Sequence, residues 1–355
     1  RDWSSDVCSS DLRMRDFIFH NPVKIYFGKG QARHIAQEVE RVEGAVLVVY
    51  GGGSIKRNGA YDDVMAALAG TGRKIIELPG VTPNPRLDKA LEGVRLVKEH
   101  GVGLILAVGG GSVIDCAKFI SLGSGIGDDE DLWDDYIETG KPAPEGLIPV
   151  GVVLTTAATG SEMGDAAVLT NWERNRKLGY TSFPLMPRFS VLDPSYLMTL
   201  PAEQTVYGFE DMFCHTCEQY FSYPVDDNLS DEIAEGIQRH ILRSWRACLA
   251  DPKDYEARSN AMWDSTLALN RIISRGKEED WVTHGIEHAL SAYTDIAHGA
   301  GLAVVHPHWM AYVYLVNDEV TARFARWAVD VWGVTPTGKT DRMVAEEGID
   351  RYVDF

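Results

Sequence analysis

The chain has 355 residues, 45% hydrophobic and 24% charged, a composition typical of an ordinary globular protein with room for two domains. Its formal net charge of −18 argues against nucleic-acid and anionic-membrane partners, because both need a basic face. No apolar run in the sequence approaches the ~18 residues of a transmembrane helix. Five cysteines in so long a chain do not make a disulfide framework, so we expect a reducing, cytoplasmic setting.

Both ends of the chain look unlike native protein. Residues 1–13 have neither a helical nor a strand period, and DWSSDVCSSDL resembles the in-frame translation of a sequencing-adapter oligonucleotide. We therefore expect a non-native leader over 1–13 and a natural start at Met14, which removes Cys8 from functional arguments. At the other end the chain stops at Phe355 within an amphipathic stretch and without a cap, which favours a truncated C-terminus.

The first half of the chain alternates short apolar runs with segments of helical period. Strands that are apolar along their whole length and separated by helices indicate a parallel sheet covered on both faces. We therefore expect an α/β dinucleotide-binding domain over 14–196. The predicted strands are 45–50, 74–80, 104–111 and 150–155, and the predicted helices include 86–100 and 113–120.

The pattern changes after about residue 196. Residues 203–332 follow a helical period with few β-branched runs, and Trp, Met, Leu and Ala recur at helical spacing. Such a stripe is typical of the core of a helical bundle. We therefore expect an all-α domain over 197–355.

Two glycine-rich turns, 51–54 and 109–112, follow predicted strands directly. Glycine lets backbone N–H groups approach a phosphate closely, and a helix starting at the turn adds the positive end of its dipole. Ser112 is also placed to cap the helix that follows it. One such turn is a weak indication, but two at the carboxyl ends of buried strands favour nucleotide binding over plain turns. Neither turn is a P-loop or a G-x-G-x-x-G fingerprint.

The first glycine turn also bears on cofactor choice. NAD-selective sites place an acidic residue after the strand to bind the ribose 2′-hydroxyl. Here Tyr50 is followed by three glycines, Ser54, Lys56 and Arg57, which leave room and positive charge for a 2′-phosphate. This favours NADP(H) over NAD(H). The alternative is that Lys56 and Arg57 form only a solvated helix start.

Histidines and one aspartate recur at helical spacing in the second half. Asp211 and His215 are four residues apart, as are His284 and His288, and residues at this spacing share one helix face. His298 begins the segment HGAG, an expected break where a side chain can turn inward. One carboxylate with three imidazoles would suit divalent iron or zinc. From spacing alone a metal site and a few hydrogen-bonded helix histidines stay equally open.

A C-x-x-C pair, Cys214 and Cys217, lies in the same segment. No second C-x-x-C is present to complete a four-cysteine zinc site. A thioredoxin-type pair would sit at a strand-to-helix turn and not within a helical half. Because Phe213, Tyr220 and Phe221 surround the pair, we expect buried, unreactive thiols.

Six segments, occurring in one order, together resemble a known family. GGGSVIDCAK, TTAATGSEMG, SVLDPSYLMTLP, EDMFCHTCEQY, THGIEHAL and HGAGLA resemble the iron-containing (group III) alcohol dehydrogenases, from about Met14 to Phe355. GGGSIKRNGAYD and KLGY are similar to the branch of NADPH-dependent aldehyde reductases and butanol dehydrogenases. The resemblance implies an N-terminal nucleotide-binding domain and a helical metal-binding domain, an architecture shared with dehydroquinate-synthase-like proteins.

The resemblance also implies roles for individual residues. His288 would lie near the nicotinamide and substrate without binding the metal, and we expect it to relay a proton to solvent. Asp115 would lie near the nicotinamide or substrate. The implied metal ligands are Asp211, His215, His284 and His298. The implied cofactor contacts are Gly52, Gly53 and Ser54 for the 2′-phosphate with Lys177 as a helper, Gly109, Gly110, Gly111 and Ser112 for the pyrophosphate, and Asn84, Thr155, Thr156 and Ser161 along the cleft.

The implied activity is reversible hydride transfer between NADP(H) and an alcohol/aldehyde pair, with reduction of short- to medium-chain aldehydes. One Fe²⁺ or Zn²⁺ would act as a Lewis acid on the substrate oxygen, and the enzyme would be a cytoplasmic homodimer. A dehydroquinate-synthase-like lyase would need a basic cluster for a sugar phosphate, and no Lys/Arg cluster stands near the metal motifs. A third interpretation is an inactive cofactor-binding fragment.

One departure from the family pattern lies after the last ligand. The segment AVVHPHWM has His306 where family members more often have an apolar residue, and His308 follows. These histidines could crowd or tune the pocket, or sit harmlessly at a helix end.

Overall fold

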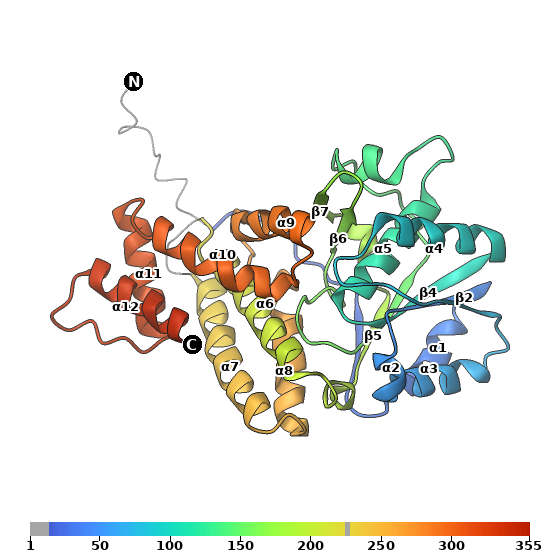
Figure 1. The fold of residues 1–355 in the computed structure, drawn as a ribbon, viewed down its shortest axis with the longest axis horizontal. Helices are drawn as coiled ribbons and strands as arrows, with labels where there is room; N and C mark the ends of the chain where they lie inside the picture. Colours follow the sequence, from blue (N-terminus) through green and yellow to red (C-terminus); the bar gives the residue numbers. More distant parts are fainter. Residues whose placement is uncertain (1–13, 224–227) are drawn as a thin grey trace.

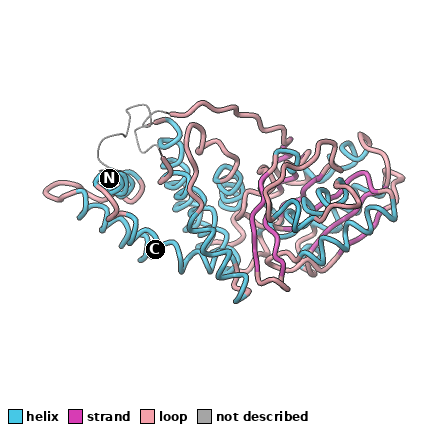
Figure 2. The backbone as a smooth tube through the Cα atoms, turned by 90° about the horizontal axis from the view of Figure 1, so that it is seen from above, coloured by secondary structure: helices cyan, strands magenta, loops and turns pink. Residues whose placement is uncertain are grey.

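The computed structural model describes residues 14–223 and 228–355, so the predicted leader 1–13 lies outside the described residues. A parallel sheet with helices on both faces forms one end of the molecule, and helices alone form the other (Figure 1, Figure 2). The expected fold class, an α/β domain followed by an all-α domain, is confirmed. No helix in these two described ranges is both long and apolar enough to cross a membrane.

The main sheet has six strands in the order β1-β8-β5-β4-β2-β3, and every neighbouring pair is parallel. Its central strands β2, β4 and β5 are buried at nearly every position, which is why they read as continuous apolar runs. The strands are β1 (Lys24–Phe27), β2 (Ala45–Tyr50), β3 (Ile75–Leu78), β4 (Val102–Gly109), β5 (Val150–Leu154) and β8 (Phe189–Leu192).

Helices cover both faces of this sheet. Val46, Val48 and Leu104 pack with α1 and α3 on one face, whereas Leu47 and Ile105 pack with α4 and α5 on the other. The alternation follows from the two-residue period of a strand. These helices are α1 (Ile35–Val39), α2 (Ser54–Arg57), α3 (Ala60–Ala69), α4 (Leu87–His100) and α5 (Gly111–Gly125).

A separate antiparallel hairpin, β6 (Ala166–Asn171) and β7 (Arg176–Thr181), was not predicted from the sequence. Neither strand is apolar along its whole length, because β6 ends in Thr170 and Asn171 and β7 has exposed positions at both ends. The hairpin stands beside α9, so it forms part of the boundary between the two halves (Figure 1).

The second half is built around α6, which is buried all round from Asp211 to Tyr220. A helix that is buried on every side belongs in the centre of a bundle. Helix α10 packs against both α6 and α9. The helices are α6 (Ala202–Tyr220), α7 (Leu229–Ala250), α8 (Tyr255–Ala268), α9 (Val282–Thr294), α10 (His298–Val313), α11 (Asp318–Asp330) and α12 (Asp341–Asp354).

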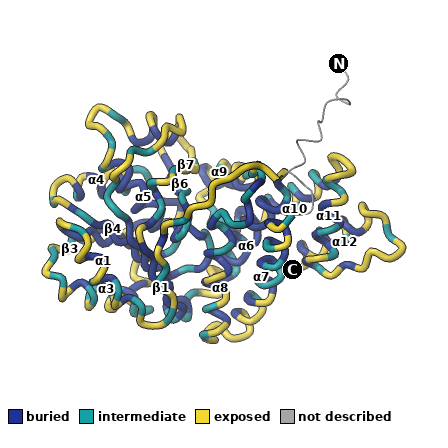
Figure 3. Tube along the Cα trace, turned by 180° about the vertical axis from the view of Figure 1, so that it is seen from behind, coloured by how far each residue is buried: buried dark blue, intermediate teal, exposed yellow. Residues whose placement is uncertain are grey.

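Buried residues form the interior of both halves, and an exposed segment crosses the outside (Figure 3). This segment starts at Met14 and leads to β1. The backbone N–H of Arg15 donates to the carbonyl oxygen of Gly276 in the helical half (2.9 Å), and Asn21 donates to Met163 beside the sheet (2.8 Å). The segment therefore connects the two halves.

Candidate metal centre and cofactor cleft

A cleft of about 380 Å³ opens where the N-terminus of α5 faces α9 and α10. Its wall takes residues from α5, from the hairpin and from the helical half, so the site depends on both parts of the chain. Ten of the residues proposed from the sequence line it: Asn84, Gly111, Ser112, Asp115, Ser161, Lys177, His215, His284, His288 and His298.

Three imidazoles converge on one carboxylate at the helical side of this cleft. The Nε2 atoms of His215, His284 and His298 lie 3.4, 3.7 and 3.5 Å from Oδ1 of Asp211. Asp211 and His215 come from the same face of α6, as their spacing predicted. His284 comes from α9, and His298 is the first residue of α10.

The three distances to Asp211 fit a single divalent ion, and the ligand atoms of Asp211, His284 and His298 all lie within 4.8 Å of one another. Ligand atoms bound to one zinc or similar ion at about 2.0–2.2 Å lie roughly 3–3.5 Å from one another. Oδ1 of Asp211 and Nε2 of His284 are buried and have no hydrogen-bond partner within residues 14–223 and 228–355. An ion among the four side chains would satisfy both atoms, and a donor set of three nitrogens and one oxygen suits Fe²⁺ and Zn²⁺ alike.

Two glutamates hold the imidazoles from behind. Glu218 contacts Nδ1 of His284, and Glu287 contacts Nδ1 of His298, so each ring presents Nε2 to Asp211. The Glu218 carboxylate also accepts from the backbone N–H of Thr283 at the start of α9 (2.7 Å). It therefore fixes the ring and the helix that carries it.

Burial and neighbouring charges together set the protonation of these side chains. It lowers the pKa of His215 to about 3, so this imidazole is neutral and its lone pair is available. Burial by itself would raise the pKa of Asp211, but His215, His298 and His284 together hold it well below its usual value, and the carboxylate is charged. Burial lowers the pKa of His284, and Glu218 and Asp211 outweigh that effect and raise it to about 9.

His288 stands apart from the convergent set. Its ring centre is 6.3 Å from that of His284 and 5.5 Å from that of His298, at the wall of the cleft. Spacing alone left His288 and His298 open as partners of His284, and the geometry favours His298. The expected break lies before His298, at the left-handed Asp295 (φ 56°), and not within HGAG, which begins α10.

Asp115 and Ser161 line the cleft and form a hydrogen bond with each other. Ser161 Oγ donates to Oδ1 of Asp115 (2.6 Å), and the backbone N–H of Val168 donates to its other oxygen (3.0 Å). The buried Lys118 donates to Ser161 Oγ (2.9 Å) and to two backbone carbonyls before and in β6 (2.9 and 2.8 Å). This network joins α5 to the loop that leads into the hairpin.

The second glycine turn is explained in part by packing. A methyl group at Gly110 would lie 2.9 Å from Thr156 Cβ, and one at Gly111 would lie 2.6 Å from Thr159 Oγ1. Gly111 and Ser112 line the cleft, whereas Gly109, Gly110, Thr155 and Thr156 do not. The expectation that Ser112 caps α5 is wrong: the capping position is Gly110, and no side chain caps this helix.

The first glycine turn gives a different result. A methyl group at Gly52 would meet nothing within 4 Å. Gly52 also has no left-handed backbone angle, so neither packing nor conformation requires glycine there. Residues 52–54 do not line the cleft described above.

Asn84 and Lys177 both reach the helical half. Asn84 donates to Oδ1 of Asp295 (2.9 Å) and to the carbonyl oxygen of Ile296 (3.2 Å), in the turn before α10. Lys177 donates to Glu287 (3.1 Å), and its Nζ lies 3.4 Å from Nδ1 of His298. Lys177 was expected to help the 2′-phosphate loop, but its contacts are at the metal centre.

Two basic residues lie beside the metal centre, where the sequence predicted no Lys/Arg cluster. Lys177 and Arg271 both line the cleft. Each is paired with carboxylates, Lys177 with Glu287 and Arg271 with Asp165 and Glu279. Both basic side chains are therefore already paired with carboxylates of the protein.

Glu218 and Glu287 were missed by the sequence analysis, although their spacing carries a signal. Glu218 follows Asp211 by seven residues, and Glu287 follows His284 by three. Both spacings return to the same helix face. The expected burial of Cys214 and Cys217 is confirmed, and neither His306 nor His308 lines the cleft.

Comparison with known proteins decides the family. The sequence profile of "Iron-containing alcohol dehydrogenase" matches residues 22–194, and that of "Fe-containing alcohol dehydrogenase family, C-terminal" matches residues 205–355. The chain belongs to the iron-containing alcohol dehydrogenase family. The family resemblance and the expected oxidoreductase class, with a metal and a nicotinamide cofactor, are thereby confirmed, and a lyase is not favoured.

Several relatives of this iron-containing alcohol dehydrogenase are similar over nearly all of the chain. A probable NADH-dependent butanol dehydrogenase 1 from Bacillus subtilis is 43% identical, covering 96% of this chain and 87% of its own length. The NADPH-dependent aldehyde reductase YqhD from Escherichia coli is 38% identical, covering 94% and 84%. The crystal structure of NADH-dependent butanol dehydrogenase A from Thermotoga maritima superposes with a TM-score of 0.90 at 43% identity, covering 96% and 84%.

Proposed function

We propose that this enzyme transfers a hydride reversibly between NADP(H) and an alcohol/aldehyde pair, with short- to medium-chain aldehydes as the substrates that it reduces. The observation that carries the proposal is the convergence of three imidazole nitrogens on Asp211 at the edge of a cleft. The same cleft is lined by Gly111 and Ser112 at the N-terminus of α5. The proposed ion-binding residues and the proposed phosphate-binding turn thus border the same cleft.

The side chains of the helical half would hold the ion. Asp211, His215, His284 and His298 would be its ligands, and Glu218 and Glu287 would keep two of the rings in place. When bound, the ion supplies Lewis acidity toward the substrate oxygen and the nicotinamide supplies the hydride.

The α/β half would orient the cofactor. Gly109, Gly110, Gly111 and Ser112 would bind the pyrophosphate, with Thr155 and Thr156 behind them. Asp115 and Ser161, held by Lys118, would position the nicotinamide ring, and Asn84 and Lys177 would close the cleft edge.

His288 is our candidate for proton relay. It lines the cleft, and burial together with the neighbouring charge of Lys177 holds its pKa well below the usual range. A neutral imidazole can accept the alcohol proton during oxidation and return a proton during reduction.

The preference for NADP(H) rests on the first glycine turn. Gly52, Gly53 and Ser54 would surround the adenosine 2′-phosphate. The guanidinium of Arg57 lies 3.2 Å from the position of a methyl group at Gly53, whereas Lys56 lies over the ring of Tyr61 (4.7 Å). Arg57 is therefore the better partner for a 2′-phosphate. Named relatives include both NADH-dependent and NADPH-dependent enzymes.

The direct test is oxidation of NADPH or NADH by a panel of aldehydes with iron, zinc or no metal added. We expect aldehyde-dependent turnover that needs metal, with a higher kcat/KM for NADPH. No turnover with any aldehyde and metal would contradict the activity and support an inactive cofactor-binding fragment. A higher kcat/KM for NADH would overturn only the cofactor preference, and Arg57→Ala should then change nothing.

The domain bounds, the oligomeric state and the cellular compartment are also proposals. We propose two domains, 14–196 and 197–355, which agrees with a last sheet strand ending at Leu192 and a central helix beginning at Ala202. We also propose a cytoplasmic homodimer; the cysteines at 116, 214, 217 and 248 are all free thiols, which suits a reducing compartment. Sedimentation velocity that returned the monomer mass would contradict the dimer.

A further inference from the structure

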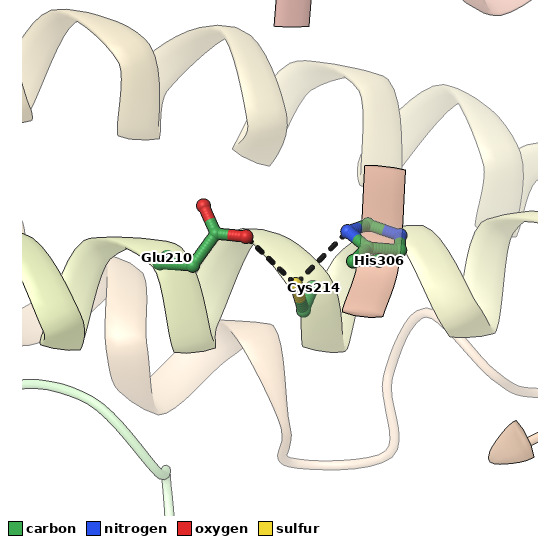
Figure 4. Close-up of side chains that lie close together, drawn as sticks. All are labelled: Glu210, Cys214 and His306. Atoms are coloured by element: carbon green, nitrogen blue, oxygen red, sulfur yellow. Dashed lines mark hydrogen bonds between the residues drawn. The ribbon is translucent and has the colours of Figure 1, made fainter. Parts of the chain in front are cut away.

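Helix α6 carries a second pair of potential ligands beside the first. Glu210 and Cys214 each precede a residue of the pair Asp211 and His215, and they share its four-residue spacing. One residue along an α-helix is a rotation of about 100°, so the two pairs face different directions. The pair Glu210 and Cys214 points toward His306 of α10 (Figure 4).

The three side chains meet closely. The Sγ atom of Cys214 lies 2.9 Å from Nδ1 of His306 and 3.3 Å from Oε1 of Glu210. One ligand atom from each residue lies within 4.8 Å of the others. Tyr352 of α12 adds a hydroxyl that donates to Glu210 and lies 3.0 Å from Nδ1 of His306.

The cluster consists of polar side chains packed among buried and aromatic residues. Cys214 and His306 are both 0% exposed, and Phe213 and Trp332 pack against Tyr352. Cys214 Sγ lies within hydrogen-bond distance of both Glu210 Oε1 and His306 Nδ1, and its single proton can be donated to only one of them. The residues that contact the Glu210 carboxylate, Cys214 and Tyr352, bring no positive charge. Among its hydrogen-bond partners in the described residues the half-buried Glu210 carboxylate has no cation, and a bound metal ion would balance its charge.

We propose that Glu210, Cys214 and His306 form a second metal site, for a borderline-soft divalent cation such as Zn²⁺. Thiolate, imidazole and carboxylate are the ligands that zinc takes in proteins, and three protein ligands leave a fourth position for water. The site is separate from the Asp211 centre, because it uses none of that centre's ligands.

The two contacts of Cys214 can be compared with those of a zinc site. In a tetrahedral zinc site the sulfur and nitrogen ligands lie about 3.5 Å apart, as do sulfur and oxygen. The contact from Cys214 to Glu210 is already close to that value, and the contact from Cys214 to His306 must widen by about half an ångström. Binding forms the sulfur–metal bond and releases the thiol proton to solvent, with no change of oxidation state.

A cavity beside Glu210 could admit an ion to the cluster. This second cavity, of about 270 Å³, is lined by Glu210 and Tyr352 among other residues of α6, α7, α10 and α12. No residue lines both this cavity and the cleft at the N-terminus of α5. The second site can therefore fill independently of substrate and cofactor.

A bound ion would join α6 to α10. These helices carry Asp211, His215 and His298, so the second site would stabilise the frame of the first without touching the substrate. Its expected role is structural.

Cobalt substitution tests the site directly. The Asp211 centre has only nitrogen and oxygen ligands, so a thiolate-to-Co²⁺ charge-transfer band in the near ultraviolet reports the second site alone. We expect the full chain with Cys8→Ser, stripped of metal and titrated with Co²⁺, to show this band and to bind a second equivalent of cobalt. A spectrum without the band, at saturation of a single site, overturns the proposal and leaves a hydrogen-bonded cluster.

Matched variants test whether the charge-transfer band arises from Cys214. Cys214→Ser and His306→Leu should each remove the band and one equivalent of cobalt. Cys217→Ser should keep both, because Cys217 is equally buried on the same helix but contacts Gln238 (3.8 Å). His284→Ala should keep the band while losing the other equivalent, which separates failure of this proposal from failure of the proposed function. A band that survives Cys214→Ser would also contradict the assignment.

Discussion

Gly52 and Gly111 are glycines for different physical reasons. A side chain at Gly111 would collide with Thr159, whereas one at Gly52 would project into open space. The packing of the protein accounts for Gly111, whereas neither packing nor backbone conformation requires glycine at 52, as we expect where a cofactor phosphate approaches the backbone. The two positions make a matched pair for testing cofactor binding.

We predict that Gly52→Ala keeps the melting temperature and raises the KM for NADPH by on the order of tenfold, equivalent to ~1.4 kcal/mol of binding. Gly111→Ala should lower the free energy of unfolding by about 1–3 kcal/mol through overpacking. Thermal unfolding and steady-state kinetics on both variants check this. An unchanged KM in Gly52→Ala would remove residues 52–54 from the cofactor site.

The described cysteines should not react in the folded protein. Burial raises the pKa of Cys116 to about 12 and of Cys248 to about 11, and it raises those of Cys214 and Cys217 well above the usual value. A raised thiol pKa leaves the neutral, weakly nucleophilic form at pH 8. In a Cys8→Ser background we expect no labelling by a thiol reagent until denaturant is added. Rapid labelling of the native chain would contradict the burial of the pair.

At the scale of elements, helix α6 is the part of the site that its sequence predicts best. The spacing of Asp211 and His215 fixes both on one face, because helical period is a local property. The choice between His288 and His298 was not readable in the same way. It depends on the turn at Asp295, where a non-glycine residue takes a left-handed conformation that no local pattern announces.

Glu218 gives a prediction for this element. Its carboxylate contacts Nδ1 of His284 and caps the start of α9, so Glu218→Gln keeps the acceptor but loses the charge that orients the ring. We expect a loss of about 10- to 100-fold in affinity for the catalytic metal. Glu203→Gln, at an exposed position of α6, is the control. Equal metal affinity in both variants, measured by competition with a chelator, would show that Glu218 does not tune the ligand.

At the scale of the whole molecule, the sequence predicts the two halves but not how they meet. Buried parallel strands read as apolar runs, so β2, β4 and β5 were expected, and so was the change to helical period. The hairpin of β6 and β7 was missed because its strands are not apolar along their whole length, and it brings Lys177 to the metal centre. Long-range contacts such as Asn84 with Asp295 leave no periodic trace in the chain.

Metal binding should stabilise the whole fold, because the ligands come from three helices. A metal that binds only the folded state at about 100 times its Kd adds ~2.7 kcal/mol to the free energy of unfolding. We therefore expect the melting temperature to rise with added Zn²⁺ and to fall on chelation. The rise should be smaller in His284→Ala. A melting temperature that does not change when Zn²⁺ is added or chelated would contradict a pre-formed site.

The measurement that tests the account most directly is metal content and aldehyde-dependent NADPH oxidation on the same preparations of wild type, His284→Ala and His288→Ala. We predict that His284→Ala loses the catalytic metal and turnover together, while His288→Ala keeps the metal and loses part of its turnover. Full turnover in His284→Ala would contradict the assignment of the ion site to Asp211 and its three histidines.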